Sequence, residues 1–243
     1  MPIERSKIKD QRSKIQNLGF LVVIFYFLFF IFDFCFAAPC YGTRMPEKHK
    51  VNMGVESYTL MKRRLGDNYG KIRSQQQFLD LSYGVFDWFS IDLKGGAGDI
   101  RSRPQTTLNV DYATGFAGGY GFRVRFLDKD KVKAVFGFQH ISVHPYSEEV
   151  NGVRNRGILD DWQTSLLASY KFKMATPYIG TRWSRVDYIH KTGDDKKRKM
   201  SDRTRSIGLI VGTDIPINER IWVNLEGQFL DSSAACASVN YSF

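Results

Sequence analysis

The last ten residues constrain the fold of this chain most, because apolar and polar side chains alternate up to the terminal residue itself. One parity is apolar, with Ala235, Ala237, Val239, Tyr241 and Phe243, and the other is small and mostly polar, with Cys236, Ser238, Asn240 and Ser242. Successive side chains of a β-strand point to opposite faces, so the segment predicts a two-faced strand. Such a strand suits a membrane barrel, with lipid outside and a polar lumen inside. An edge strand of a soluble sandwich is the alternative.

The amino-terminal segment predicts export. Residues 1–17 are basic, and an apolar run over residues 18–32 precedes the small pair Ala37-Ala38. This order is typical of a cleaved signal peptide. A permanent anchor is the alternative, because the run almost reaches the roughly 20 residues that a membrane helix needs. A lipid anchor is disfavoured, since Pro39 stands just before Cys40.

The predicted organisation therefore has three parts. They are a signal peptide at residues 1–38, a periplasmic tail at residues 39–50 and a barrel at residues 51–243. Although 43% of residues are hydrophobic, no second long apolar run follows the signal, which excludes a helical membrane protein. The three cysteines form no disulfide framework, and we expect Cys40 and Cys236 to lie far apart.

The same alternation recurs along the chain and predicts about ten strands. In one example, Leu79, Leu81 and Tyr83 alternate with Asp80 and Ser82. The clear apolar columns contain no charged residue, as a lipid-facing wall requires, because an Arg or Lys at the bilayer midplane costs roughly 2–4 kcal/mol.

One predicted strand, from Pro177 to about His190, breaks this rule. Its outward column would continue through Arg185 and Asp187. We therefore predict a bulge near Ser184 that returns Val186 and Tyr188 to the lipid side.

The connections alternate between short turns and longer polar links. The longer links are predicted at residues 66–74, 99–109, 146–157 and 193–203, and residues 231–233 form a short one. Barrels of the outer membrane place short turns in the periplasm and long loops outside, so both termini are predicted to be periplasmic.

The terminal aromatic residue and the repeated hairpin, as in residues 82–90, resemble those of small bacterial outer-membrane β-barrels. The resemblance implies an all-β fold, a closed antiparallel up-and-down transmembrane β-barrel of about ten strands. It also implies the outer membrane of a Gram-negative-type bacterium as the location. Tyr241 and Phe243 would then be the assembly signal read by the barrel-assembly machinery.

The predicted inward columns carry charges of both signs. They are Glu56, Asp80, Asp92, Lys94, Arg123, Arg125, Lys133, Lys171, Asp214 and Glu226. A barrel of about ten strands is narrow, so these side chains are expected to pair and plug the lumen. The alternative is a narrow pore whose cations favour anionic solutes.

A basic run, Lys196-Lys197-Arg198-Lys199, falls in a predicted outer loop. It predicts either a solvated mobile loop or contact with the phosphates of an anionic glycolipid. The other expected partner is the surrounding outer-membrane lipid. No motif suggests nucleic acid, and we expect a monomer without cofactor or metal.

His140 and Ser142 share one strand face, and Glu148 follows in the next loop. Base, nucleophile and carboxylate are what acyl transfer needs, and the spacing faintly resembles that of outer-membrane lipid A deacylases. The residues after Ser142 depart from that family. The omptin proteases also have ten strands, but His190 and Asp187 are isolated here.

The sequence thus favours an outer-membrane barrel with a structural or surface-binding role through its extracellular loops. A narrow passive pore is the second hypothesis. A membrane-embedded lipid hydrolase is the third.

Overall fold

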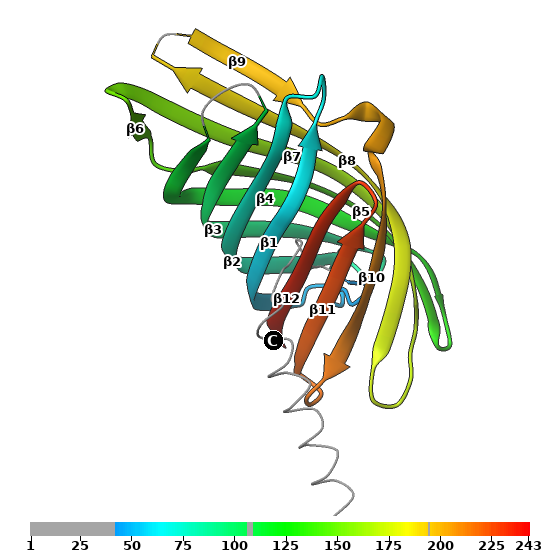
Figure 1. Ribbon diagram of the computed structural model, residues 1–243. Coiled ribbons are helices and arrows are strands. Elements are labelled where there is room, and N and C mark those ends of the chain that lie inside the picture. The colour runs from blue at the N-terminus through cyan, green and yellow to red at the C-terminus, as the bar shows by residue number, and fades with distance from the viewer. Residues whose placement is uncertain (1–41, 106–108, 194) are drawn as a thin grey trace, which may run out of the picture. The chain divides into compact units, whose positions relative to one another are not determined.

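The computed structural model describes residues 42–105, 109–193 and 195–243. The predicted signal peptide, Cys35 and Cys40 lie outside the described residues. Strands dominate the described part (Figure 1). They are β1 (Val51–Leu65), β2 (Gly70–Phe86), β3 (Phe89–Pro104), β4 (Val110–Lys129), β5 (Val132–His144), β6 (Glu148–Val150), β7 (Val153–Tyr170), β8 (Thr176–Thr192), β9 (Asp195–Met200), β10 (Ile207–Pro216), β11 (Ile221–Phe229) and β12 (Ser232–Ser242). A short 3-10 helix, η1 (Arg203–Arg205), precedes β10.

Ten of these strands close into an antiparallel barrel in the order β1-β2-β3-β4-β5-β7-β8-β10-β11-β12. The ring closes where β12 pairs with β1, placing Val239 opposite Val55. The backbone N–H of Phe243 donates to the carbonyl of Val51 at 3.0 Å, so the pairing reaches the last residue. Closure leaves no strand edge of the wall unpaired, which a bilayer demands because lipid offers no hydrogen bonds. The predicted fold class is confirmed.

β6 and β9 are short strands outside this ring. β6 pairs with the start of β7, and β9 pairs with the end of β8. Both extend the wall at the end of the barrel opposite the short turns at residues 87–88, 130–131, 171–175 and 217–220. In the described residues, no helix is long and apolar enough to cross a membrane.

The barrel wall has two halves with opposite polarity. Near the short turns, outward residues are apolar and exposed, as at Leu79 and Leu81, whereas Asp80 and Ser82 face inward and are buried. We call this the membrane half. Farther along β2 the parity continues but the chemistry inverts. The outward residues are Lys71, Arg73, Gln75 and Gln77, and the inward ones include Ile72 and Phe78.

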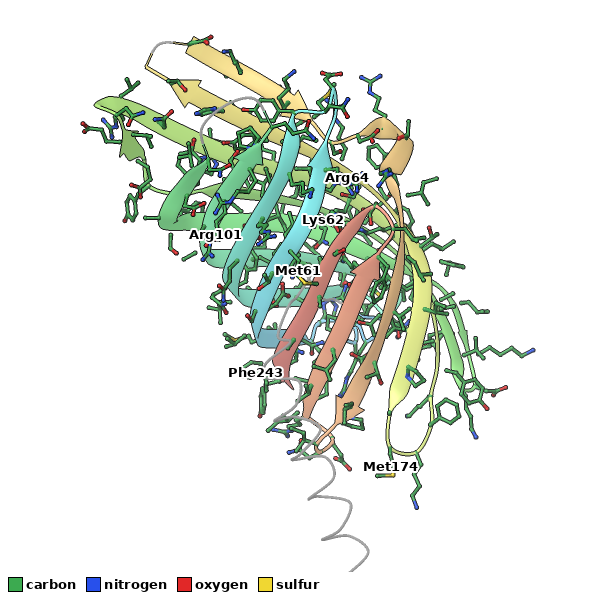
Figure 2. The ribbon with its side chains drawn as sticks, viewed as in Figure 1. Met61, Lys62, Arg64, Arg101, Met174 and Phe243 are labelled. Atoms are coloured by element: carbon green, nitrogen blue, oxygen red, sulfur yellow. The ribbon has the colours of Figure 1, made fainter. Side chains whose placement is uncertain are left out.

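We call this second region, which lies away from the short turns, the outer half. Figure 2 shows Lys62 and Arg64 on β1 and Arg101 on β3 in this half, whereas Phe243 and Met174 lie at the opposite end of the barrel. Its lumen is filled by an apolar cluster. The buried members are Tyr58, Leu60, Leu65, Ile72, Phe78, Ile100, Val110, Tyr112, Ala117, Ile141, Val143, Leu159, Val186, Tyr188, Ala234 and Cys236. The wall therefore continues beyond its lipid-facing belt, with a polar outside and an apolar inside.

Strands replace most of the long loops expected from the sequence. β2 already begins at Gly70, β3 runs to Pro104 and β7 begins at Val153. The predicted loop bounds were wrong because polar residues on the outward face of a strand give the same sequence signal as a polar loop.

The bulge predicted near Ser184 was also wrong. β7 and β8 pair from Ser169↔Tyr178 to Asn155↔Thr192 without a register shift. Val186 and Tyr188 each expose only 1% of their surface and belong to the apolar cluster. Arg185 and Asp187 face outward, as an unbroken strand requires. They are stable there because this part of β8 lies in the outer half, where Arg198 of β9 pairs with Asp187.

The expected absence of a disulfide was also wrong at Cys236. The sequence suggested no disulfide framework, yet this buried residue of β12 is disulfide-bonded. The chain's other two cysteines lie outside the described residues.

Candidate functional site

The lumen of the membrane half holds a buried charge cluster around Lys94 of β3. Its ammonium lies 2.5 Å from Glu56 Oε2 and 3.5 Å from Asp80 Oδ1. The three side chains come from adjacent strands, β1, β2 and β3, because their inward parity aligns them in register: Gly54↔Asp80 and Asp80↔Lys94 are cross-strand partners. A buried charge is tolerated only when it is paired, and here each charge has a partner of opposite sign within the lumen.

A second ion pair lies toward the short-turn end. Arg123 of β4 donates to both oxygens of Asp92, at 3.0 and 2.7 Å, in the bidentate geometry that makes arginine–carboxylate pairs strong. It also donates to Ser82 Oγ at 3.2 Å and to the carbonyl of Arg44 at 2.8 Å. Arg123 therefore connects the wall to the segment that precedes β1.

That segment, residues 42–50, enters the mouth of the barrel. Thr43 donates to Ser169 Oγ at 2.7 Å, and the Arg44 guanidinium lies 4.0 Å from the centroid of the Trp222 ring. Thr43 and Met45 are buried. The described part of the predicted periplasmic tail is thus packed against the inner wall at the mouth of the barrel.

Asp214 and Glu226, also predicted for the lumen, join a network of neutral donors. Asn224 Nδ2 donates to Asp214 Oδ1 at 2.6 Å, and the Tyr178 hydroxyl donates to Glu226 Oε2 at 2.9 Å. All four side chains are buried. The network crosses from β8 to β11 and fills the lumen on the side opposite Lys94.

Three predicted lumen cations lie instead at the mouth. Arg125 and Lys133 reach Asp128 at 3.2 and 3.4 Å, and Lys171 is exposed beyond the end of β7. They line a recess of about 860 Å³ together with Arg44 and other residues of the tail. Their strands end here, so inward parity no longer means burial.

The most buried charge cluster was not predicted as a site. Asp231 Oδ2 accepts from Arg63 at 2.6 Å and from Arg182 Nη2 at 2.8 Å, and these three side chains are at most 1% exposed. Asp161 extends the cluster by accepting from Ser184 Oγ at 2.9 Å.

Strand length explains this cluster. The β11–β12 hairpin ends lower than β1 and β8 (Figure 1), so arginines of those two strands meet over its turn. The alternation along β8 gives Arg182 the inward parity, so the sequence could have identified this residue as part of the lumen. Arg63 could not, because a bulge between Leu60 and Lys62 changes its parity. Asp231 stands in what the sequence presents as a loop.

The lumen retains little free volume. A cavity of about 30 Å³ lies beside Arg123 and Glu226, and one of about 10 Å³ lies beside Tyr58 and Gln76. A single water needs roughly 10–15 Å³ of such space, so the first cavity has room for about two waters and the second for about one.

The proposed catalytic residues form a different network from a triad. Ser142 Oγ donates to Asp160 Oδ1 at 2.5 Å, and His144 Nε2 lies 2.8 Å from Ser142 Oγ. The Ser142 hydroxyl thus donates to a carboxylate, and its histidine neighbour is His144 and not the expected His140. The His140 ring packs against Trp162 with ring centroids 4.0 Å apart and the planes tilted by 32°, and Glu148 accepts from the Ala113 N–H. Within the described residues, no group of three side chains is arranged to hold a metal.

The basic run Lys196–Lys199 is not a loop. It forms most of β9, where Lys199 lies 3.3 Å from Asp67 and Arg198 pairs with Asp187. Lys197 lies 3.0 Å from Asp195. Lys196 stands opposite Lys191 of β8 and makes no ion pair within the described ranges.

Comparison with known proteins identifies similarity to chlamydial porins over part of the chain. The profile of the Chlamydia major outer membrane protein family matches residues 150–201, which include β7, β8 and β9. The major outer membrane porin of Chlamydia trachomatis serovar C is 26% identical over 141 residues, covering 40% of this chain and 35% of that porin. The serovar A porin is 44% identical over 43 residues, covering 17% and 11%. The chain thus spans about a third or less of the length of these relatives.

Among solved structures, the outer-membrane protease OmpT of Escherichia coli has a TM-score of 0.45 at 12% identity, with 83% of this chain and 99% of that chain covered. The transport unit of the autotransporter AIDA-I from E. coli has a TM-score of 0.44 at 14% identity, with 80% and 89% covered. The chain is a small outer-membrane β-barrel, with sequence similarity to major outer membrane porins.

Proposed function

We propose that this protein is a closed outer-membrane barrel that acts through its outer surface and does not conduct solutes through its lumen. The observation that carries the proposal is that side chains fill the lumen along its length. The tail residues Thr43 and Met45 occupy the mouth, the Lys94 and Arg123 ion pairs occupy the membrane half, and the apolar cluster occupies the outer half. A conducting pore needs a continuous aqueous path, and each of these layers opposes one.

A narrow pore is the second candidate, because the relatives are named porins. Those porins are about three times longer than the matched region, so their activity does not transfer directly. If the lumen did open, Lys94 and Arg123 would be paired with Glu56 and Asp92, which leaves little net charge for anion selection.

Planar-bilayer recording of the refolded chain from residue 39 onward tests the proposal. We expect no discrete conductance steps, while the Chlamydia trachomatis porin reconstituted by the same protocol supplies the positive control. Removing residues 42–45 should leave the barrel closed, since the apolar cluster of the outer half stays in place. Discrete steps from the intact chain would overturn the proposal. Steps only after removal of residues 42–45 would show that the tail alone is the gate.

We also infer that the outer half faces the exterior and both termini face the periplasm. The support is that short turns gather at one end and the β6 and β9 extensions at the other. Single cysteines at Lys196 and at Lys173 test this orientation in whole cells, since both parent residues are exposed. Lys196→Cys should react with an impermeant maleimide and Lys173→Cys should not. The reverse labelling pattern would show that the barrel has the opposite orientation in the membrane.

A further inference from the structure

A row of cations crosses three strands on the outer wall. Arg156 of β7 stands directly opposite Lys191 of β8, and Lys191 stands opposite Lys196 of β9. Directly opposed residues of antiparallel strands project to the same face, so the three charges lie side by side. Like charges in this arrangement repel one another, and within the described residues none of the three has an ion pair. The arrangement calls for an anion from outside the chain.

Acidic side chains around the row have other partners. Asp195, next to Lys196, lies 3.0 Å from Lys197. Asp160 accepts from Ser142, Asp187 pairs with Arg198, and Glu148 accepts from the Ala113 N–H. Glu149 stands opposite Arg154, the next cation on β7. The row itself therefore keeps a local positive charge.

Two cations of the row, Arg156 and Lys191, border a groove of about 340 Å³ on the outer wall. It is lined by His144, Tyr146, Arg156, Ile158, Ile189 and Lys191, among others. Ile158 and Ile189 are cross-strand partners one step toward the membrane half. Farther in that direction, Trp162 and Trp183 are exposed at the top of the lipid-facing belt, where aromatic side chains mark the membrane interface. Between the tryptophans and the isoleucines, the cross-strand partners Asp160 and Asp187 share this face, and they bond to Ser142 and Arg198. Ile158 and Ile189 thus form an apolar step between these carboxylates and the row of cations.

We propose that this groove binds the phosphorylated headgroup of an anionic glycolipid in the outer leaflet. Arg156 and Lys191 would contact phosphate oxygens, and Ile158 and Ile189 would contact the apolar part of the lipid next to its sugar. The apolar step argues for a lipid over free phosphate, because an inorganic ion gains nothing from the two isoleucines. The proposal rests on the orientation proposed above and names the partner of the outer surface.

The test compares two double variants of the refolded barrel with equal loss of charge. Arg156→Gln/Lys191→Gln alters the groove. Lys71→Gln/Arg73→Gln alters exposed cations on the outer half of β2, several strands away around the barrel. Each protein is placed in phosphatidylcholine vesicles with or without a bisphosphorylated glycolipid, and the retained glycolipid is quantified by mass spectrometry after extraction. Heat-modifiable gel migration verifies that each variant is folded.

We expect the groove variant to bind the glycolipid at least about tenfold more weakly, since it loses two charge-assisted hydrogen bonds. The β2 variant should stay within about twofold of the unaltered chain. Ile158→Ser/Ile189→Ser should also weaken retention. Equal loss in both charge variants, equal retention of a dephosphorylated glycolipid, or displacement by inorganic phosphate alone would overturn the proposal. The measurement reports on the outer wall only, so its failure is distinguishable from any conductance of the lumen.

Discussion

The two halves of the barrel use the same strands with opposite chemistry. In the membrane half, Leu81 and Leu93 face outward and are exposed, while Asp80 and Asp92 are buried inside. In the outer half, Arg73 and Gln75 face outward, and Ile72 and Ile100 are fully buried inside. The medium outside explains the inversion: lipid requires an apolar wall and leaves the lumen for paired charges, whereas water permits an ordinary apolar core within the ring. The outer half is therefore held together as a soluble protein is, and the membrane half is not.

The largest effect should come from the boundary between the halves, at Asp231. Asp231→Ala leaves Arg63 and Arg182 buried without their carboxylate, and breaking such a cluster costs about 3–5 kcal/mol. Urea unfolding of the barrel in lipid vesicles measures the change. Asp128→Ala, which removes the half-exposed partner of Arg125, is the control and should cost less than about 1 kcal/mol. Similar losses at both positions would mean that burial does not set the cost.

The next test asks whether the outer half has a true apolar core. Ile100→Ala removes a fully buried side chain from the lumen cluster and should destabilise the barrel by about 2–5 kcal/mol. Ile91→Ala lies on the same strand but faces lipid, which can refill the space, so we expect a smaller loss. Equal free energies of unfolding for the two variants would contradict the comparison.

A charge placed on the outside of β2 should then locate the edge of the lipid belt. Leu81→Arg puts a cation in lipid and should cost up to roughly 2–4 kcal/mol. Gln75→Arg has the same parity six residues away, in the outer half, and should be almost neutral. Yields of folded barrel in vesicles give the readout. An equally severe assembly defect in Gln75→Arg and Leu81→Arg would show that the lipid-facing belt reaches into the outer half.

The smallest expected effect concerns the tail. Arg44→Ala removes the cation–π contact with Trp222 and a hydrogen bond to the Glu219 carbonyl, and should cost about 0.5–2 kcal/mol. Lys48→Ala, at an exposed position of the same segment, is the matched control. Identical unfolding midpoints for the two variants would show that the tail does not stabilise the membrane half.

The residues of the candidate sites differ in how far the sequence could place them. Lys94, Glu56 and Asp80 were placed in the lumen by parity alone, because they lie in regular stretches whose other face is apolar. Arg63 and Asp231 were missed, since a bulge and a turn interrupt the alternation. The cation row of β7, β8 and β9 was also missed, because it exists only through cross-strand register.

Alternation along the chain was enough to predict the barrel, the strand faces of the membrane half and the closing strand at Phe243. These follow from a period of two, which is a local property that each segment carries independently. Three further features emerge only from strand pairing in space. They are the end of the lipid belt, the continuation of the strands into an outer half with an apolar interior, and the charges that meet across the ring. Those features depend on strand length and on pairing between residues far apart in the chain, and alternation has the same period whichever face meets water.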